Sequence, residues 1–400
     1  MLSSNKLSAS FVPAVAGIAA GLLCSGCASP PPGPRAPTAE VEQVAAYVPP
    51  PRPAEPAMNT AGDAQMTIFG ELPDQSRVPF VTRAASPMRQ HSFTAEGADF
   101  DVDVSPDGQW IVFSSTRHTA NPDLYLKRAE GQAVTQLTSD PAPDVQPCFH
   151  PDGKRILFAS LRSGNWDIWT VQLHGGQATQ MTRSPMHEVH PSVSPDGGRL
   201  VYCMFNERSE QWELWIQQLS ITGARRMIGV GLFPEWSPNA ESVVYQRARE
   251  RGGRWFSIWR VDLDNGEPQF PIEIASRTDA ALIQPNWSPD GQWITYGTAR
   301  LSDDPGQMTP NYPVMSSGDI WIVKADGSEP MQLTDGGGKH FGSVWGPKDQ
   351  VFFTSMQNGS ENIWSVQPLL AGTPDNLPKS NDSTASTGSA AENASAREGS

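Results

Sequence analysis

The chain has 400 residues and a formal net charge of −14, and 38% of its residues are hydrophobic. This acidic balance argues against a nucleic-acid partner, because the phosphate backbone selects basic surfaces. The cysteines show no metal-ligand spacing, and the sequence contains no phosphate-binding loop, dinucleotide fingerprint or G-x-S-x-G turn. We therefore expect no metal, no cofactor and no catalytic residue.

Residues 1–27 resemble a bacterial lipoprotein signal. Lys6 precedes an apolar stretch, Phe11–Leu23, which is too short to span a bilayer and is typical of a signal-peptide core. The stretch runs into the letters LCSGC, which predict that Cys27 is lipidated and becomes the new N-terminus. Ala28 in the next position favours the outer membrane. Ordinary secretion with cleavage after a small residue stays open as the alternative.

Two segments flank the part of the chain that we expect to fold. Residues 28–87 are rich in proline, which favours an extended polyproline II tether of roughly 3 Å per residue. Residues 371–400 are rich in Ser, Ala, Asn and Thr and are predicted to be a disordered tail. The sequence thus predicts one folded domain, 88–370.

A hairpin with a tight turn recurs through this domain. In "FDVDVSPDGQWIVFSS" (100–115), Pro106 fixes φ at the first corner, Asp107 can bond to its own backbone, and Gly108 accepts a positive φ. The flanks alternate apolar and polar residues, as half-buried strands do. The turn prolines that mark the copies are Pro106, Pro151, Pro195, Pro238, Pro289 and Pro347.

Two aromatic columns accompany the turns. The second strand of each unit ends in Phe113, Phe158, Tyr202, Tyr245, Tyr296 and Phe353, and the third carries Tyr125, Trp169, Trp215, Trp259, Trp321 and Trp364. A short fourth strand, such as "QLT" at 136–138, follows most units. Four strands per unit and a period of 43–58 residues predict an all-β, six-bladed propeller of four-stranded antiparallel blades.

The ends of the array predict how the ring closes. The last unit has no fourth strand, whereas an unassigned strand, Met88–Thr94, precedes the first unit. We predict that this segment completes the blade of Trp364. Such a pairing removes two exposed sheet edges, which are an aggregation hazard.

The repeat unit, for example "PCFHPDGKRILFASLRSGNWDIWTV" at 147–171, is similar to the WD40-like propeller repeat of the TolB family. The resemblance covers roughly 88–370 and does not include the α/β domain that precedes the propeller in TolB. It implies a periplasmic protein that acts as a protein–protein interaction scaffold, in protein transport for example. The implied partner is an envelope protein, with the peptidoglycan-associated lipoprotein as the first to try, and the membrane contact is the lipid anchor alone. We expect a monomer.

Polar residues at the start of the innermost strands form the first candidate site. They are Asp99, Asp101, Asp144, Glu188, His190 and His340. Connectivity places them round one mouth of the central channel, where they can bind a cation or a basic peptide segment; the other interpretation is that carboxylates stay solvated at a loop end. "HEVH" (187–190) is one residue short of the zinc-protease motif and lies on a strand, so it predicts no metal site.

Two loops of neighbouring units form the second candidate. The loop 246–255 carries Arg247, Arg249, Arg251 and Arg254, and the insertion 301–318 carries Met308, Tyr312 and Met315. Arginines can grip carboxylates on a partner, and a long apolar loop on a rigid scaffold suits docking. Both segments also fit a simpler interpretation, as a solvated hairpin and a tolerated insertion.

Three functions follow from these candidates. The first is a non-catalytic envelope scaffold. The second is a channel-mouth enzyme or small-ligand or carbohydrate-binding propeller, such as a sugar-acid lyase, that uses His190, His340, Asp144 and Glu188. The third is a spacer without specific partners.

Cys148 and Cys203 fall in packing columns of different blades, where two free thiols are favoured over a disulfide.

Overall fold

The computed structural model of the chain describes residues 84–370, apart from 85, 221–223, 249–255, 302–314, 336–337 and 358. The predicted signal with Cys27, the tether up to residue 83 and the tail lie outside the described residues. Within the described part, no helix is both long and apolar enough to cross a membrane.

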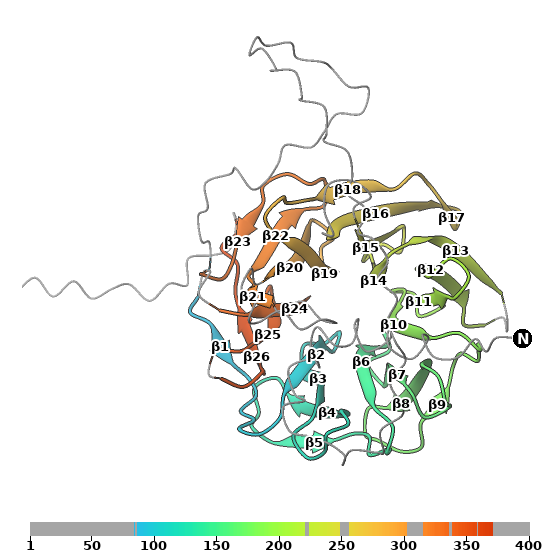
Figure 1. The fold of residues 1–400 in the computed structure, drawn as a ribbon. Helices are drawn as coiled ribbons and strands as arrows, with labels where there is room; N and C mark the ends of the chain where they lie inside the picture. Colours follow the sequence, from blue (N-terminus) through green and yellow to red (C-terminus); the bar gives the residue numbers. More distant parts are fainter. Residues whose placement is uncertain are drawn as a thin grey trace, which may run out of the picture.

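Six antiparallel sheets stand round a central axis, and each contributes its first strand to the centre (Figure 1). Blade one has β2 (Asp99–Val104), β3 (Trp110–Ser115), β4 (Asp123–Arg128) and β5 (Val134–Gln136). Blade two has β6 (Asp144–Phe149), β7 (Arg155–Ser160), β8 (Asp167–Gln172) and β9 (Thr179–Gln180). Blade three has β10 (Glu188–Val193), β11 (Arg199–Asn206), β12 (Gln211–Gln218) and β13 (Arg225–Val230).

The later blades carry additional short strands. Blade four has β14 (Leu232–Trp236), β15 (Ser242–Ala248) and β16 (Phe256–Asp264), and both β17 (Glu267–Pro268) and β18 (Ile272–Ala275) pair with β16. Blade five has β19 (Ala281–Trp287), β20 (Trp293–Leu301), β22 (Ile320–Lys324) and β23 (Met331–Gln332), and β21 (Met315–Ser317) pairs with β20. Blade six has β24 (His340–Trp345), β25 (Val351–Ser355), β26 (Asn362–Val366) and β1 (Arg89–Gln90). The prediction of a six-bladed propeller is confirmed.

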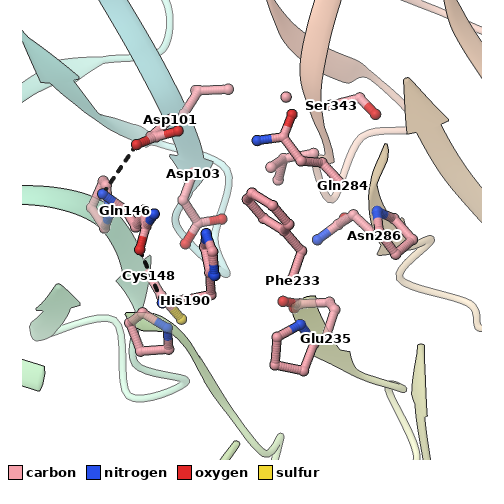
Figure 2. A pocket seen from close by; sticks show the side chains of 17 residues that line it. Asp101, Asp103, Gln146, Cys148, His190, Phe233, Glu235, Gln284, Asn286 and Ser343 are labelled. Carbon is pink, nitrogen blue, oxygen red and sulfur yellow. Dashed lines mark hydrogen bonds between the residues drawn. The ribbon is translucent and has the colours of Figure 1, made fainter. Parts of the chain in front are cut away.

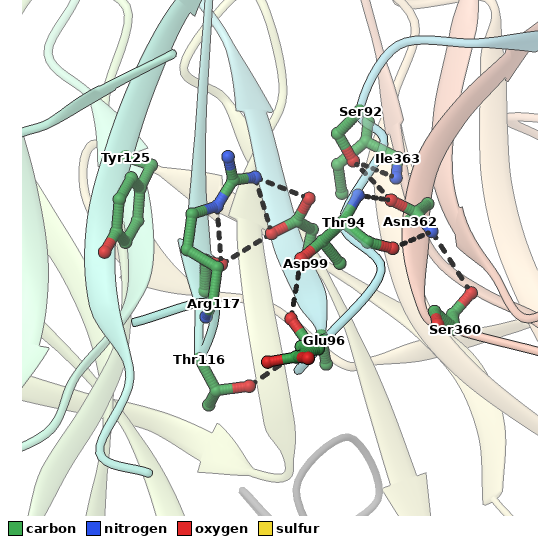
Figure 3. Close-up of polar contacts among 12 residues, drawn as sticks. Ser92, Thr94, Glu96, Asp99, Thr116, Arg117, Tyr125, Ser360, Asn362 and Ile363 are labelled. Carbon is green, nitrogen blue, oxygen red and sulfur yellow. Dashed lines mark hydrogen bonds and ion pairs between the residues drawn. The ribbon is translucent and has the colours of Figure 1, made fainter. Parts of the chain in front are cut away.

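The two ends of the array pair in blade six, as the sequence predicted. β1 lies antiparallel to β26, with Arg89 opposite Ser365. Beyond β1, the His91 N–H donates to the Ile363 carbonyl (2.8 Å), and the Thr94 N–H donates to Asn362 Oδ1 (2.7 Å; Figure 3). The segment before the first unit therefore closes the ring, although its regular strand is only two residues long.

The recurring turns have the predicted backbone. Gly108 has a φ of 66°, and its N–H donates to the Ser105 carbonyl at 2.8 Å. In the two turns without this glycine, Ala240 (φ 60°) and Asp349 (φ 56°) adopt the left-handed conformation instead. The turn geometry thus survives the loss of its preferred residue, at a modest steric cost.

The two aromatic columns lie directly opposite each other in every blade. The cross-strand pairs are Phe113–Tyr125, Phe158–Trp169, Tyr202–Trp215, Tyr245–Trp259, Tyr296–Trp321 and Phe353–Trp364. All six second-strand aromatics are at most 1% exposed. They pack in apolar layers between neighbouring blades; one such layer joins Phe113 of blade one to Phe352 and Ile363 of blade six.

The closure of blade six can be tested at Asn362. The substitution Asn362→Ala removes the acceptor of the Thr94 N–H, and we expect it to lower the free energy of unfolding by about 1–3 kcal/mol. It should also speed tryptic cleavage after Arg89, because β1 loses its anchor. Urea denaturation and timed proteolysis measure both effects.

Ser360→Ala is the matched control, since its 3.5 Å bond to the Ala95 carbonyl is exposed. An Asn362→Ala protein with the control's stability and cleavage rate would show that this bond does not hold the closure.

Candidate functional site in the central channel

One residue in every innermost strand has a left-handed backbone. These residues are Asp101, Gln146, His190, Phe233, Gln284 and Gly342, with φ between 50° and 64°. A register shift in the pairing of each innermost strand with its neighbour marks a β-bulge at this point. Five of the six are not glycine, so the backbone stores strain round the whole channel, as it often does at functional sites.

The bulges shape a cavity of about 120 Å³ on the axis of the propeller, lined by all six innermost strands (Figure 2). Its lining comes from these left-handed residues and from the one or two residues that follow each of them. The side chains with polar or aromatic chemistry are Asp101, Asp103, Gln146, Cys148, His190, Phe233, Glu235, Gln284, Asn286 and Ser343. Oxygen acceptors dominate this set, and the cavity therefore suits a ligand that donates hydrogen bonds.

Several of these side chains also connect one blade to the next. The Phe149 N–H donates to Asp103 Oδ2 (2.6 Å), and the Trp345 N–H donates to Asn286 Oδ1 (2.9 Å). Asp103 and Asn286 each lie two residues after the left-handed residue of their strand. Each accepts from the residue that lies three places after the left-handed residue in the following blade. An aspartate and an asparagine thus perform the same structural task in different blades.

Burial leaves three carboxyl groups of the cavity poorly solvated. It raises the pKa of Asp101 and of Asp103 to about 7. Hydrogen bonds from backbone N–H groups lower both pKa values, but by less than burial raises them. It raises the pKa of Glu235 to about 8, with a further contribution from the charge of Asp103. Among the described residues, none of the three carboxylates forms an ion pair with a lysine, arginine or histidine.

His190 is the second unusual group in the cavity. The residue is 5% exposed, and neither ring nitrogen has a hydrogen-bond partner among the described residues. The ring lies against Phe233, with 3.7 Å between the ring centroids. Burial lowers the pKa of His190 to about 3, so the imidazole is neutral and one ring nitrogen is an acceptor.

The first residues of the innermost strands do not line this cavity. Asp99 and Asp144 are fully buried, and each carboxylate accepts two hydrogen bonds from an arginine, Arg117 (2.9 and 2.7 Å) or Arg162 (2.8 and 2.6 Å). The Arg117 guanidinium also lies 5.0 Å from the centre of the Tyr125 ring (Figure 3). These aspartates therefore hold the scaffold together.

Glu188 and His340 are also buried at first positions. Glu188 lies 3.5 Å from the Arg225 guanidinium, and the His340 ring packs edge-on against Phe353. Of the six residues predicted at the channel mouth, the structure brings Asp101 and His190 into the cavity lining. The sequence reasoning missed Asp103, Gln146, Phe233, Glu235, Gln284 and Asn286. A signal existed, because a proline directly follows the left-handed residue in four of the six strands.

The second candidate site is described in part. Arg247 lies on β15, half-buried, with its guanidinium 5.1 Å from the centre of the Trp259 ring. The backbone of Met315 lies in β21, whereas Arg249, Arg251, Arg254, Met308 and Tyr312 fall outside the described residues. Cys148 and Cys203 are free thiols, as the sequence favoured.

Residues 63–266, just over half of the chain, match the family model of the TolB beta propeller domain. An uncharacterized protein of Agrobacterium fabrum is 31% identical over 121 residues, which are 30% of this chain and 34% of that relative. The chain thus matches about a third of the relative's length.

Two solved structures have a similar fold. One is described as a candidate TolB from Agrobacterium tumefaciens, with a TM-score of 0.51 and 19% identity over 68% of this chain and 91% of that one. The other is TolB from Acinetobacter baumannii, with a TM-score of 0.44 and 17% identity over 70% of this chain and 65% of that one. The match to the family model confirms the resemblance to the TolB propeller.

The buried ion pairs at the first positions can be tested at Arg162. Arg162→Met leaves the Asp144 carboxylate buried without its partner, and we expect a loss of about 3–5 kcal/mol in the free energy of unfolding. The double variant Arg162→Met with Asp144→Asn should recover much of that loss. Urea denaturation measures each variant.

Arg155→Met is the control, since its pair with Asp152 is solvent-exposed and worth less than about 1 kcal/mol. Equal losses for the two single variants would refute a special role for the buried pair.

The carboxyl groups of the cavity predict an unusual dependence of stability on pH. In an unfolded chain an aspartate ionises at about pH 4, whereas in the cavity the pKa of Asp103 is about 7. The folded state holds the proton more strongly, so it loses stability as the pH rises between these values. Asp103→Asn should therefore be more stable than the parent at pH 8, by on the order of 1–3 kcal/mol, and gain little at pH 5.

Denaturant midpoints at the two pH values measure this difference. Asp196→Asn is the control of opposite sign, because hydrogen bonds from Ser194 and from the Gly198 N–H lower the pKa of Asp196. The prediction is wrong if the stability gain of Asp103→Asn over the parent is the same at pH 8 as at pH 5. Asp103 would then not be a carboxyl group whose ionisation destabilises the fold.

Proposed function

The chain belongs to the TolB β-propeller family, and from that premise we propose that it is a non-catalytic lipoprotein of the cell envelope whose propeller binds a protein partner in the periplasm. The observation that carries the proposal is the set of three cavity carboxyl groups without an ion-pair partner among the described residues. Such groups make a polar recess on a rigid ring, which is a suitable site for one protruding group of a partner. The predicted lipid at Cys27 and the proline-rich tether supply the attachment to the membrane.

The partner that we propose to test first is a peptidoglycan-associated lipoprotein. The loops that carry Arg247 and Met315 leave blades four and five, whose innermost strands line the cavity with Glu235 and Gln284. We propose that the two loops form the outer part of the contact and the cavity its centre.

A catalytic function is the second candidate, and the cavity itself is the observation that favours it. Neutral His190 and carboxyl groups with pKa values of about 7 to 8 are suitable for proton transfer near neutral pH. Of the four residues considered for an enzyme, however, only His190 lines the cavity. We therefore favour binding over catalysis.

Site-specific photo-crosslinking in the living envelope tests the proposed scaffold. A photoreactive residue at position 247 or 312 should yield one discrete adduct with an envelope protein, identified by mass spectrometry. The same residue at Phe270, which is 94% exposed near the outer edge of blade four, is the control and should yield none. Adducts of the same pattern from all three positions, or from none, would contradict a specific partner at this face.

A further inference from the structure

We infer that the central cavity is a binding site for a primary alkylammonium group, which the carboxylates of Asp103 and Glu235, the imidazole of His190 and the ring of Phe233 receive together. The inference deepens the proposed function and rests on it for the source of the group, a lysine side chain of the partner. A free alkylamine has the same chemistry, and the experiment separates the two sources.

The balance of charge is the first argument. At the first position of the innermost strands, each buried carboxylate has an arginine: Asp99 has Arg117, Asp144 has Arg162, and Glu188 has Arg225. Further along the innermost strands, Asp101 and Asp103 on β2 and Glu235 on β14 have no ion-pair partner among the described residues. These three residues are half-buried in the recess, where an ionised carboxylate without a counter-charge is less favourable than in open water, and a bound cation removes that cost.

The unpartnered imidazole is an independent second argument. His190 is nine-tenths buried and lines the cavity, and both of its ring nitrogens lack a hydrogen-bond partner in the described structure (Figure 2). A neutral imidazole offers one acceptor, and an ammonium group has three donors and no acceptor. The acceptor on His190 and the carboxylate oxygens therefore complement the same donor-only group.

The remaining lining favours an ammonium over other cations. Asp101 and Asp103 each use one oxygen to accept a backbone N–H, so neither presents the two free oxygens that a guanidinium fork prefers. The described residues contain no group of three or more His, Cys, Asp or Glu arranged to hold a metal ion. The face of Phe233 suits an organic cation, through a cation–π contact.

The size of the cavity fixes the kind of ligand. About 120 Å³ accommodates one slender side chain or a small amine. A lysine carries its charge on a flexible four-carbon stem, and it can reach into such a recess from a partner docked on the face of the propeller. The stem then lies against Val102, Pro147 and the other apolar parts of the lining.

Calorimetric titration of the full chain tests the inference with three probes. They are cadaverine, Nα-acetyl-lysine N-methylamide, and the same blocked lysine acetylated on Nε. We expect the first two to bind and the third, which has no charge, not to bind. Asp103→Asn and Glu235→Gln should each weaken binding about tenfold, and Phe233→Leu should weaken it several-fold.

We expect the Asp103→Asn variant to keep the fold, because an asparagine, Asn286, already makes the equivalent interblade hydrogen bond in blade five. Asp196→Asn is the matched control and should bind as the parent does. The affinity should also rise from pH 6 to pH 8.5, because the site must lose protons to accept a cation. The charged and titratable groups around it are Asp101, Cys148, His190, Glu361 and Lys339.

Several results would overturn the inference. Equal binding of the Nε-acetylated probe, unchanged affinity in both carboxyl variants, or displacement of cadaverine by equimolar Ca²⁺ would each do so. Binding of cadaverine without binding of the blocked lysine would assign the site to free amines and remove the partner's lysine. If the blocked lysine binds but crosslinking finds no partner, the proposed scaffold function is wrong and the ammonium site is kept. If crosslinking finds a partner but the blocked lysine does not bind, the ammonium site is wrong and the scaffold function is kept.

Discussion

The antiparallel pairing of β1 with β26 is the contact on which the whole ring depends. It joins Arg89 to Ser365, so segments separated by nearly the whole domain must meet before blades one and six become neighbours. The entropy of closing such a loop grows only slowly with its length, so a few well-buried hydrogen bonds suffice to hold it. His91, Ser92 and Asn362 supply those bonds behind the short strand.

Once the ring is closed, polar groups join neighbouring blades near the axis and aromatic groups join them further out. The aromatic pairs fill the wedge between neighbouring blades. Near the axis the wedge narrows, and side chains such as Asp103 and Asn286 reach across to the backbone of the next blade. The neighbouring blade thus satisfies backbone N–H groups of the innermost strands, and side chains that line the cavity also hold the ring together.

Much of this architecture could be predicted from the sequence because the same four-strand unit is repeated along the chain. The Ser-Pro-Asp-Gly turns and the two aromatic columns recur in register, and those columns proved to be directly opposed pairs such as Phe158 and Trp169. The missing fourth strand of the last unit identified the closing segment. In each case the physical cause acts locally, on a turn or on one strand pair.

The cavity was harder to predict because its cause is a left-handed backbone conformation that glycine marks in only one of the six blades. Asp101, Gln146 and Phe233 adopt positive φ although none is glycine, and simple alternation along the strand then misassigns which side chains face the axis. The burial of Asp99 had a signal that was not used. Each of the first two units has Ser-x-Arg after its second strand, and Arg117 and Arg162 are the partners of the buried aspartates.

The charge of Asp103 is separable from its structural task. Blade five makes the same interblade bond with the neutral side chain of Asn286, so the fold does not require a carboxylate at this position. A carboxylate there is less favourable than an amide whenever the cavity holds no cation, because burial raises its pKa and opposes its ionisation. The same reasoning applies to Glu235, whose ionisation the charge of Asp103 further opposes. Two such groups in one small recess make the empty ring less stable at neutral pH, and a cation that neutralises both removes the conflict. The stability of the propeller and the occupancy of its channel are then coupled through the same two carboxyl groups.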